Sequence, residues 1–537
     1  MYKKFLIIIG LFFSVQSFSQ NLSIDWSEKF NYEKETGFLD TIFGENENSL
    51  FVKFYSFRTN PLILNGPKSN IKIQLATIDK KTKKKTSTLN LIGYKENDSQ
   101  ESKYKDIEFY KVVMTKNVIY VLWVNKFDFY NVNYSLYAQT FDLNFKPLQP
   151  LKKIIDLKIT KDFIKRPVFF ATTIPENDNI FVGSELNGKE NENLKIDVRL
   201  LKPNLTLSTT KIIEFPSELT KDYDINHLLA NYSGIKGEKL VIETMYNTGV
   251  FNFSNNSSII LPADFENKVV QSSKFYIENN TLKFFGTFSE KFTEILSEKK
   301  PGIFTFDLDL ITMKISNSQF IYFTNEQVNL LFSKLNKDLP DTYASDPLFD
   351  RRKMYYTLDE LIIEKGSFFM FLSKSLFFKT NYDYVFSYKE TIAPMRLTND
   401  GKISIFNLIQ RNEFYNGDII PKDDVSTLKD ENNYYVFFGW QPKNEKKTFS
   451  IDLLSDDYVN YASKFQYYIT DIKTGISTFK SFNVFNKANK SDIKYISYDG
   501  AKLIGDNSYY FISVEEPNIM GNSNKKSKQI GKLQISK

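Results

Sequence analysis

The feature that most constrains the fold is a run of strands and tight turns between residues 117 and 155. Val118 to Asn125 and Ser135 to Leu143 predict two strands, and the turn Asn144-Phe145-Lys146-Pro147 leads into a short third one. Branched and aromatic side chains dominate, and they favour a pleated, half-buried surface. No apolar stripe with a helical period competes with this interpretation. The stretch therefore predicts an antiparallel sheet.

Looser versions of this unit recur along the chain. Their leading strands begin near residues 50, 118, 179, 239, 282, 361, 433 and 508. Most of these spacings exceed the repeat of about 40 to 50 residues that is usual for propellers, so we expect long loops. We predict an all-β fold, a β-propeller of seven blades with six or eight as alternatives, covering residues 20–537.

One segment breaks the strand pattern. The sequence Thr324-Asn325-Glu326-Gln327 fits a capping box, in which the threonine hydroxyl and the glutamine side chain bond each other's backbone amides. Apolar residues then follow at helical spacing, on one face: Val328, Leu331, Phe332 and Leu335. We predict a single inserted helix of about twelve residues that covers a sheet edge or a channel mouth.

The N-terminus has the pattern of a signal peptide in residues 1–19. Lys3 and Lys4 are followed by an apolar stretch from Phe5 to Phe13, and Ser17-Phe18-Ser19 supplies the small residues before a cleavage site. The alternative, a membrane anchor, is disfavoured because this apolar stretch is too short to span a bilayer core of about 30 Å. We expect cleavage after Ser19, export to the periplasm, outer surface or medium, and no transmembrane segment in the mature chain.

The composition excludes several kinds of chemistry. The chain has no cysteine and one histidine, His227, which rules out disulfides, thiolate metal sites and multi-histidine zinc sites within one chain. No nucleophile elbow accompanies His227 and no glycine-rich nucleotide loop occurs, so we expect no metal and no cofactor. The 70 basic and 64 acidic residues are interspersed, which disfavours nucleic acid as a partner. The basic run Asp79 to Lys85 is interpreted as a solvated hairpin tip.

The C-terminal half resembles an uncharacterised family of secreted, propeller-like proteins from AT-rich Gram-negative bacteria. The similarity covers roughly Leu282 to Lys537 and rests on the order of its strand and turn segments. These segments are GTFSEKFTEILSEKKPGIFTFDLDLITMKI, LDELIIEKGSFFMFLSKS, APMRLTNDGKISIFNLIQRNEF and NNYYVFFGWQPKNEKK. The chain departs from the family at Thr380 to Tyr388, where a longer polar insertion is expected. The resemblance implies a propeller fold and export, and it brings no catalytic residues.

Carboxylate pairs are the candidate catalytic groups, because glycoside hydrolysis needs two carboxyl groups on either side of the bond. The candidates are Asp423-Asp424, Asp430-Glu431 and Asp456-Asp457. Asp307 and Asp309 share one face of a strand and could line a calcium site, although the loop of an EF-hand is absent. A carbohydrate-active hydrolase that uses a carboxylate pair is therefore the alternative function.

The candidate binding residues are Trp440, Asp423 and Asp424. Trp440 ends an apolar strand and opens a polar loop, where an aromatic ring can stack on a sugar or anchor a partner protein; packing against a neighbouring sheet is its other possible role. Trp123, inside the strand YVLWV, is expected in the core. We predict an exported, envelope-associated binding or scaffolding protein with a protein or glycan partner, and we favour a non-enzymatic role.

Overall fold

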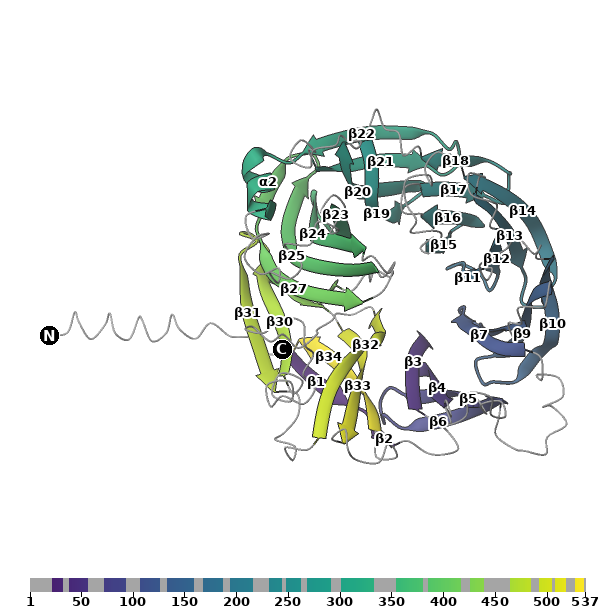
Figure 1. Ribbon diagram of the computed structural model, residues 1–537. Coiled ribbons are helices and arrows are strands. Elements are labelled where there is room, and N and C mark those ends of the chain that lie inside the picture. The colour runs from purple at the N-terminus through teal and green to yellow at the C-terminus, as the bar shows by residue number, and fades with distance from the viewer. Residues whose placement is uncertain are drawn as a thin grey trace.

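Eight antiparallel sheets follow one another around a ring in the computed structural model (Figure 1). The structure describes residues 22–31, 38–56, 72–92, 107–125, 133–158, 168–186, 194–215, 231–243, 248–261, 268–290, 301–332, 354–379, 385–416, 425–438, 464–483, 492–504, 508–517 and 527–535. This order is that of a β-propeller. The all-β prediction is confirmed, and the ring has eight blades, one more than the favoured number and within the predicted range.

The first four blades each use four consecutive strands. We letter the strands of each blade a to d, from the channel to the outer rim (Figure 1). Blade 1 holds β3 (Phe38–Glu45), β4 (Ser49–Ser56), β5 (Lys72–Asp79) and β6 (Lys85–Ile92); blade 2 holds β7 (Ile107–Met114), β8 (Val118–Asn125), β9 (Asn133–Asp142) and β10 (Pro147–Lys158). Blade 3 holds β11 (Phe169–Thr173), β12 (Ile180–Leu186), β13 (Leu194–Leu201) and β14 (Leu207–Phe215); blade 4 holds β15 (Asn231–Ile235), β16 (Lys239–Glu243), β17 (Thr248–Asn252) and β18 (Ser258–Leu261).

The last four blades vary this plan. Blade 5 holds β19 (Lys268–Glu278), β20 (Thr281–Glu290), β21 (Gly302–Asp309) and β22 (Ile315–Tyr322), and blade 6 holds β23 (Met354–Glu364), β24 (Ser367–Lys379), β25 (Val385–Thr398), β26 (Ile403–Phe406) and β27 (Ile409–Asn416). Blade 7 holds β28 (Val425–Lys429), β29 (Asn433–Phe438), β30 (Lys464–Asp471) and β31 (Ser477–Asn483). Blade 8 holds β32 (Asp492–Ile504), β33 (Ser508–Pro517) and β34 (Ser527–Ile535).

The N-terminal strand completes blade 8 and closes the ring. β1 (Leu22–Trp26) pairs antiparallel with β34, with Leu22 opposite Ile535, and the short β2 (Phe30–Asn31) pairs with the start of β34. Purple β1 therefore lies against yellow β34 in Figure 1, although they come from opposite ends of the described chain. Leu22, Ile24 and Trp26 of this ring-closing strand pack into one apolar cluster with residues of blades 7 and 8.

The position of a strand within its blade follows from its side chains. The b strand β8, with the sequence VIYVLWVN, is buried along almost its whole length, and Trp123 is fully buried as expected. The d strand β22, with the sequence ISNSQFIY, is largely exposed. Continuous apolar runs therefore form the middle of a blade, where a neighbouring blade covers each face, and polar strands form the rim.

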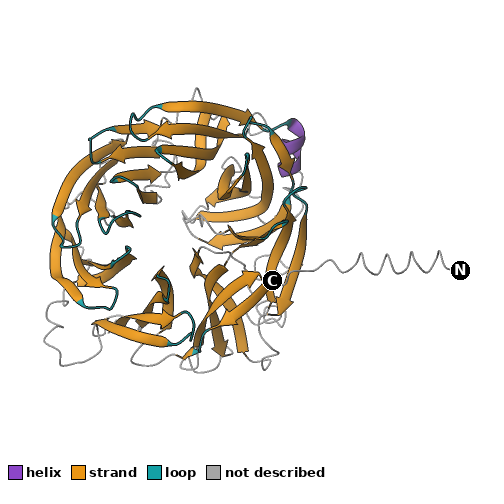
Figure 2. Ribbon diagram, turned by 180° about the vertical axis from the view of Figure 1, so that it is seen from behind, coloured by secondary structure: helices purple, strands orange, loops and turns teal. Residues whose placement is uncertain are grey.

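The predicted helix is present as α2 (Asn325–Phe332), on the outside of the ring at the seam between blades 5 and 6 (Figures 1 and 2). Its capping box forms as expected: Gln327 N donates to Thr324 Oγ1 at 3.2 Å, and Thr324 N donates to Gln327 Oε1 at 2.9 Å. Leu331 is buried in a cluster with Phe285 and Met370. The described helix is shorter than predicted, and Leu335 lies outside the described residues.

The c–d turns share a backbone conformation that helps to pack one blade against the next. Each has one residue with positive φ: Lys83, Phe145, Leu205, Asn256, Met313, Gly401 and Gly475. Phe145 and Leu205 are buried in clusters with the preceding blade. At Gly475 a Cβ atom would lie 2.2 Å from Ile405 of blade 6, so this turn approaches its neighbour too closely for a side chain.

Candidate functional site

The antiparallel order of each blade sends its connections to two opposite ends of the ring. The a–b and c–d connections are short turns at one end, which we call the turn end. The b–c and d–a connections leave from the other end, which we call the connection end; they include residues 57–71, 333–353 and 439–463, which lie outside the described residues. Long loops on a rigid scaffold are the usual carriers of recognition, so the connection end is the candidate functional face.

The predicted binding residues Trp440, Asp423 and Asp424 lie outside the described residues. The strands that flank them are described. Val425, which opens β28, is opposite Phe438, which ends β29, so both strands reach the connection end of blade 7 at this pair. The register therefore brings the two candidate segments to one end of one blade. His227 and Asp456-Asp457 also lie outside the described residues.

Bulges in two inner strands each carry an aspartate. Asp40 in β3 and Asp359 in β23 each stand where the strand carries one residue more than its partner. Such bulges redirect a side chain and are frequent near functional sites. Asp40 pairs with Lys53 at 2.8 Å, whereas Asp359 is 1 % exposed and accepts from the hydroxyls of Thr357 and Ser373. Both carboxylates are thus held by partners in their own blade.

Neighbouring blades are joined by polar contacts along the inner strands. Ser273 of blade 5 donates to Glu243 Oε1 of blade 4 at 2.6 Å. Leu358 N of blade 6 donates to Ser272 Oγ of blade 5 at 3.1 Å. Lys111 Nζ of blade 2 donates to the Ala171 carbonyl of blade 3 at 3.1 Å. These contacts are specific to each seam and fix the relative position of the blades that carry the connection end.

Glu185 at the connection end of β12 differs from the carboxylates described so far. It is 2 % exposed, and its Oε1 accepts from Tyr232 Oη of blade 4 at 2.7 Å. In the described part of the chain, its Oε2 is a buried oxygen without a hydrogen-bond partner. Burial raises the pKa of Glu185 to about 7, against the opposing effect of the Tyr232 hydrogen bond. A carboxyl group with this pKa can hold or release a proton near neutrality.

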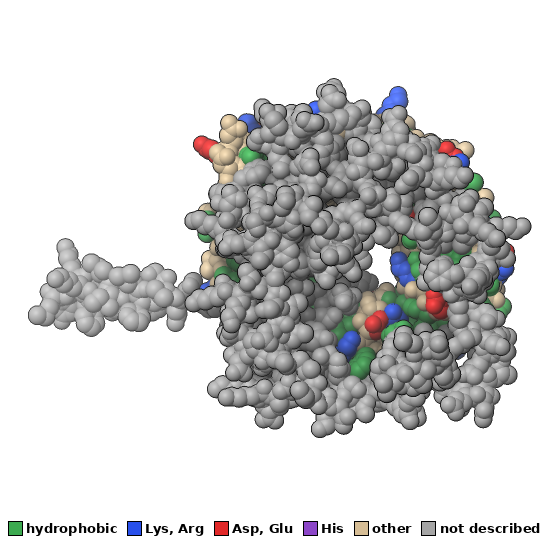
Figure 3. All heavy atoms as spheres, in the orientation of Figure 1, with side chains coloured by type: hydrophobic (Ala, Val, Ile, Leu, Met, Phe, Trp, Pro, Cys, Tyr) green, Lys and Arg blue, Asp and Glu red, His purple; other side chains and the backbone are tan. Residues whose placement is uncertain are grey.

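The middle of the ring is hollowed on the face shown in Figure 3. Acidic, basic and apolar side chains lie together on the wall of this hollow, on the side where Figure 1 shows the inner strands β3 and β7. Near this wall Lys53 Nζ of β4 lies 5.0 Å from the centre of the Phe109 ring of β7. Burial, Asp40 and Glu108 together raise the pKa of the neighbouring Tyr55 hydroxyl. The described part of this wall therefore carries charged groups of both signs beside apolar groups, and no concentration of one charge.

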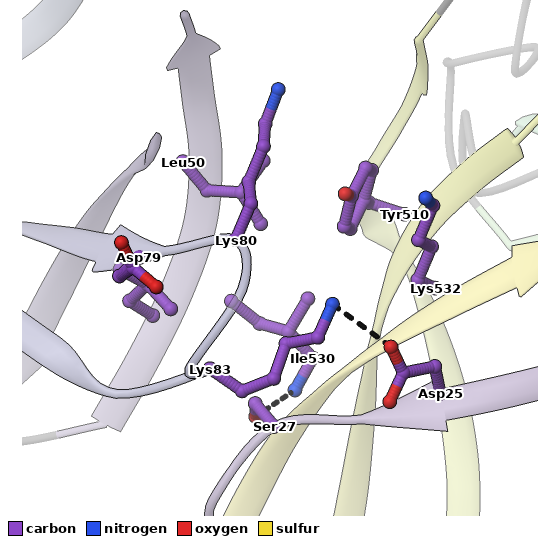
Figure 4. Close-up of a pocket in the computed structure, with 10 residues that line it drawn as sticks. Asp25, Ser27, Leu50, Asp79, Lys80, Lys83, Tyr510, Ile530 and Lys532 are labelled. Carbon is purple, nitrogen blue, oxygen red and sulfur yellow. Dashed lines mark hydrogen bonds and ion pairs between the residues drawn. The ribbon is translucent and has the colours of Figure 1, made fainter. Parts of the chain in front are cut away.

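A small cavity lies at the seam between blades 8 and 1 (Figure 4). Its volume is about 10 Å³, room for about one water molecule. Lys83 points across it to Asp25 of β1, with Nζ 3.0 Å from the carboxylate, and Ser27 Oγ accepts from Ile530 N at 2.9 Å. Lys532 and Tyr510 line the opposite wall. The cavity is too small for a substrate, so its residues serve ring closure.

The lysine run at this seam is more than a solvated hairpin tip. Lys80 Nζ lies 2.8 Å from Glu45 Oε2, and Lys85 Nζ lies 4.8 Å from the centre of the Phe54 ring. With the Lys83–Asp25 pair, three of these lysines contact the protein itself. The sequence interpretation is corrected in this respect, because β1 brings Asp25 and β3 brings Glu45 to the turn, and neither residue is in the local sequence.

Several predicted carboxylate candidates serve the backbone of turns. Asp309 Oδ1 accepts from Ile311 N at 2.9 Å and Thr312 N at 2.6 Å, and these hydrogen bonds, that of Thr312 first, lower the pKa of Asp309. Asp307 accepts from Asn317 Nδ2 at 2.8 Å. Asp430 accepts from Asn432 N in an a–b turn. Asp309 and Asp430 thus stabilise turns at the end opposite to the candidate face, and Asp307 bonds within its own blade.

Two searches of the described residues gave negative results. No group of three or more histidine, cysteine, aspartate or glutamate side chains is arranged to hold a metal ion. No helix in the same ranges has the length and apolar character needed to cross a bilayer.

Comparisons with known proteins add little. No protein-family model matches the chain, and no curated protein matches it. Among solved structures, an α-L-arabinofuranosidase from Fusarium graminearum has a TM-score of 0.26 and 9% identity over 80% of this chain and 93% of its own. A mutant Trypanosoma rangeli sialidase has a TM-score of 0.26 and 9% identity over 97% of both chains. An exo-1,5-α-L-arabinanase from a bovine ruminal metagenomic library has a TM-score of 0.22 and 8% identity over 71% of this chain and 100% of its own. At these scores the similarities support no functional argument.

Proposed function

We propose that this chain is an exported binding or scaffolding protein of the cell envelope that contacts a protein or glycan partner with its connection end. The observation that carries the proposal is the difference between the two ends of the ring. At the turn end, the described turns are short and their polar groups bond one another, as in the Asp309 turn. The longer connections leave from the other end, and long loops on a rigid scaffold are the usual carriers of recognition.

The N-terminal pattern supports export. β1 begins at Leu22, directly after the predicted signal peptide, so cleavage after Ser19 leaves the ring-closing strand whole. We expect the mature protein to start at Gln20, which N-terminal peptide mapping of the exported protein will check. Recovery of peptides from Met1 to Gln16 in that material would contradict the proposal of a cleaved signal.

The alternative is a hydrolase that acts on carbohydrate, and it requires two carboxyl groups about 5 to 10 Å apart in one cleft. Three carboxylates of the two innermost strands serve different contacts: Asp40 bonds Lys53 in blade 1, Glu243 bonds Ser273 of blade 5, and Asp359 bonds hydroxyls of blade 6. This distribution favours a structural use of these groups and hence the binding function.

A binding experiment with Trp440→Ala tests the proposal. The full mature chain is used to capture partners from envelope fractions and to probe a panel of envelope glycans. We expect Trp440→Ala to weaken capture, because an aromatic anchor contributes much of the energy of an interface. Asp423→Asn and Asp424→Asn are expected to weaken capture less.

The matched control is Lys473→Ala, an exposed position in the c–d turn of the same blade. It is expected to leave capture unchanged because it lies at the turn end. Equal loss in both variants would contradict the assignment of the binding face. Release of reducing sugar from the glycans would favour the hydrolase instead. If Trp440 belongs to the core, its replacement costs about 3–5 kcal/mol, which thermal unfolding will detect.

A further inference from the structure

Two glutamates form the same contact at different seams but with different surroundings. Glu185 of blade 3 accepts from the Tyr232 hydroxyl of blade 4, and Glu364 of blade 6 accepts from the Tyr434 hydroxyl of blade 7. Arg396 Nε lies 3.0 Å from Glu364 Oε2 and Lys429 lies 3.8 Å from Oε1. A comparison of Glu185 with Glu364 therefore separates the effect of the tyrosine hydrogen bond on the carboxyl group from the effect of a neighbouring cation.

The surroundings of Glu185 contain no such cation among the described residues. Tyr232 comes from β15, and Tyr110 of β7 lies close enough to Tyr232 to raise its pKa. β11 offers Phe170, whose ring stacks on Tyr232 at 3.6 Å between centroids. On β13 Glu185 is opposite Ile196, so the charged Lys195, Asp197 and Arg199 point to the other face of the sheet.

The inner strands on the two sides of this seam also pack closely against each other. The backbones of β11 and β15 approach so closely that a Cβ atom at Gly234 would lie 2.3 Å from the Thr173 carbonyl oxygen. Gly234 N donates to Thr172 Oγ1 at 3.3 Å across the same seam. A charged carboxylate that is buried with one oxygen unpartnered and no neighbouring cation is strongly disfavoured, whereas the neutral acid is tolerated.

We propose that Glu185 is a proton-sensing group: the seam between blades 3 and 4 is closed over the neutral carboxyl group and loosens when this group ionises. Because Glu185 stands at the connection end of β12, pH would act on the spacing of two blades beneath the candidate binding face. The proposal concerns the seam alone and does not depend on the proposed partner.

The raised pKa sets the direction of the effect. A carboxyl whose pKa is about 7 in the folded chain and near its usual 4.5 when unfolded holds its proton only in the folded state between these values. The folded state is therefore favoured at the acid end of this interval and loses stability as pH rises through it. The unfolding constant is expected to increase by up to about tenfold per pH unit and to level off above pH 7.

The first test is urea unfolding of the full mature chain at pH values from 5 to 8. Glu185→Gln keeps the shape and removes the charge, so it should abolish most of the rise in the unfolding constant and unfold less readily than the wild type at pH 8. Glu364→Gln is the matched control. Burial alone would raise the pKa of Glu364, but the Tyr434 hydrogen bond and Arg396 lower it. This variant should therefore be less stable than the wild type at every pH and should keep the rise in the unfolding constant. An unchanged rise in Glu185→Gln would overturn the proposal.

A spectroscopic test remains if Glu185→Gln does not fold. Infrared difference spectra of the wild-type chain should show a protonated-carboxyl stretch that titrates near pH 7. Tyr232→Phe removes the hydrogen bond that stabilises the charged form, so the midpoint should move to higher pH. A merely structural role for Glu185 predicts no such band at neutral pH, and its absence would equally overturn the proposal.

Discussion

The seam between blades 1 and 2 and the seam between blades 8 and 1 use the same turn position with opposite chemistry. Phe145, in the c–d turn of blade 2 with φ of 64°, is buried edge-on against Phe51 of blade 1. Lys83, in the c–d turn of blade 1 with φ of 62°, instead pairs with Asp25 beside a small cavity. The two side chains differ although φ at this position is nearly identical.

The comparison shows what the turn and the side chain each contribute. The backbone conformation is set by hydrogen bonds within the turn, such as Phe145 N to the Asp142 carbonyl and Lys83 N to the Asp79 carbonyl. The side chain at the positive-φ position then decides how that seam is filled. Apolar filling removes surface from water, whereas a partly exposed ion pair contributes little. At the closing seam the apolar contribution comes instead from residues of the strands, such as Leu39, Leu50 and Ile530, which form one buried cluster.

The largest expected effect is at the apolar seam. Phe145→Ala should lower the free energy of unfolding by about 3–5 kcal/mol, because a large buried side chain is lost and a cavity remains. Alanine and phenylalanine experience similar strain at positive φ, so the change reports packing. Urea unfolding measures it, and a loss below about 1 kcal/mol would contradict the proposed role of this turn residue.

An intermediate effect is expected at Gly475, where the turn of blade 7 presses on blade 6. Gly475→Ala should cost about 2–4 kcal/mol, since it combines a positive φ of 68° with a contact at 2.2 Å to Ile405. Gly366→Ala is the control, with φ of 81° and open space around the new Cβ atom. It should cost only the backbone strain, about 1–2 kcal/mol. Equal melting temperatures for the two variants would show that blades 6 and 7 shift to accommodate the new Cβ atom.

The smallest effect is expected at the closing seam. Lys83→Ala should cost about 0.2–1 kcal/mol, because Asp25 is half exposed and water screens the pair. The difference from the wild type should shrink in concentrated salt. Lys83→Met, which copies Met313 of blade 5, should remove the salt dependence and stay within about 1 kcal/mol of the wild type. A salt-independent loss in Lys83→Ala would indicate that packing of the lysine stem dominates.

The sequence predicted the architecture well because the b strands carry the strongest signal. The strands expected near residues 118, 239 and 508 correspond to β8, β16 and β33, each the second strand of its blade. These strands are covered on both faces, so their apolar runs are continuous and visible without any knowledge of the fold. The helix was predictable for a similar reason, because its capping box is local.

The number of blades was harder to predict. The position expected near residue 361 lies in the a strand β23 rather than in the b strand β24, because β23 is itself long and apolar. A repeat signal exists in the c–d turns, where Asp79 and Thr82, Asp309 and Thr312, and Asp471 and Thr474 form the same hydrogen bonds. It occurs in only some of the blades, so it does not count them.

The candidate site could be predicted only in part. Strand order brings Val425 and Phe438, which flank the candidate segments, to one end of blade 7, and Trp440, Asp423 and Asp424 themselves lie outside the described residues. Glu185 gave no sequence signal, because its environment comes from Phe170 on β11 and Tyr232 on β15. A pKa depends on burial, and burial depends on residues that are distant in sequence.

The pairing of β1 with β34 has a consequence for biosynthesis. Each of the other blades is built from strands close together in sequence, so its hydrogen bonds can form as soon as that segment emerges. The register of Leu22 with Ile535 requires the first described strand and the last one at the same time. A prematurely terminated product would retain most blades but leave the edge of β1 unpaired, and unpaired edges promote aggregation. Closure of the ring therefore requires synthesis of the chain as far as β34.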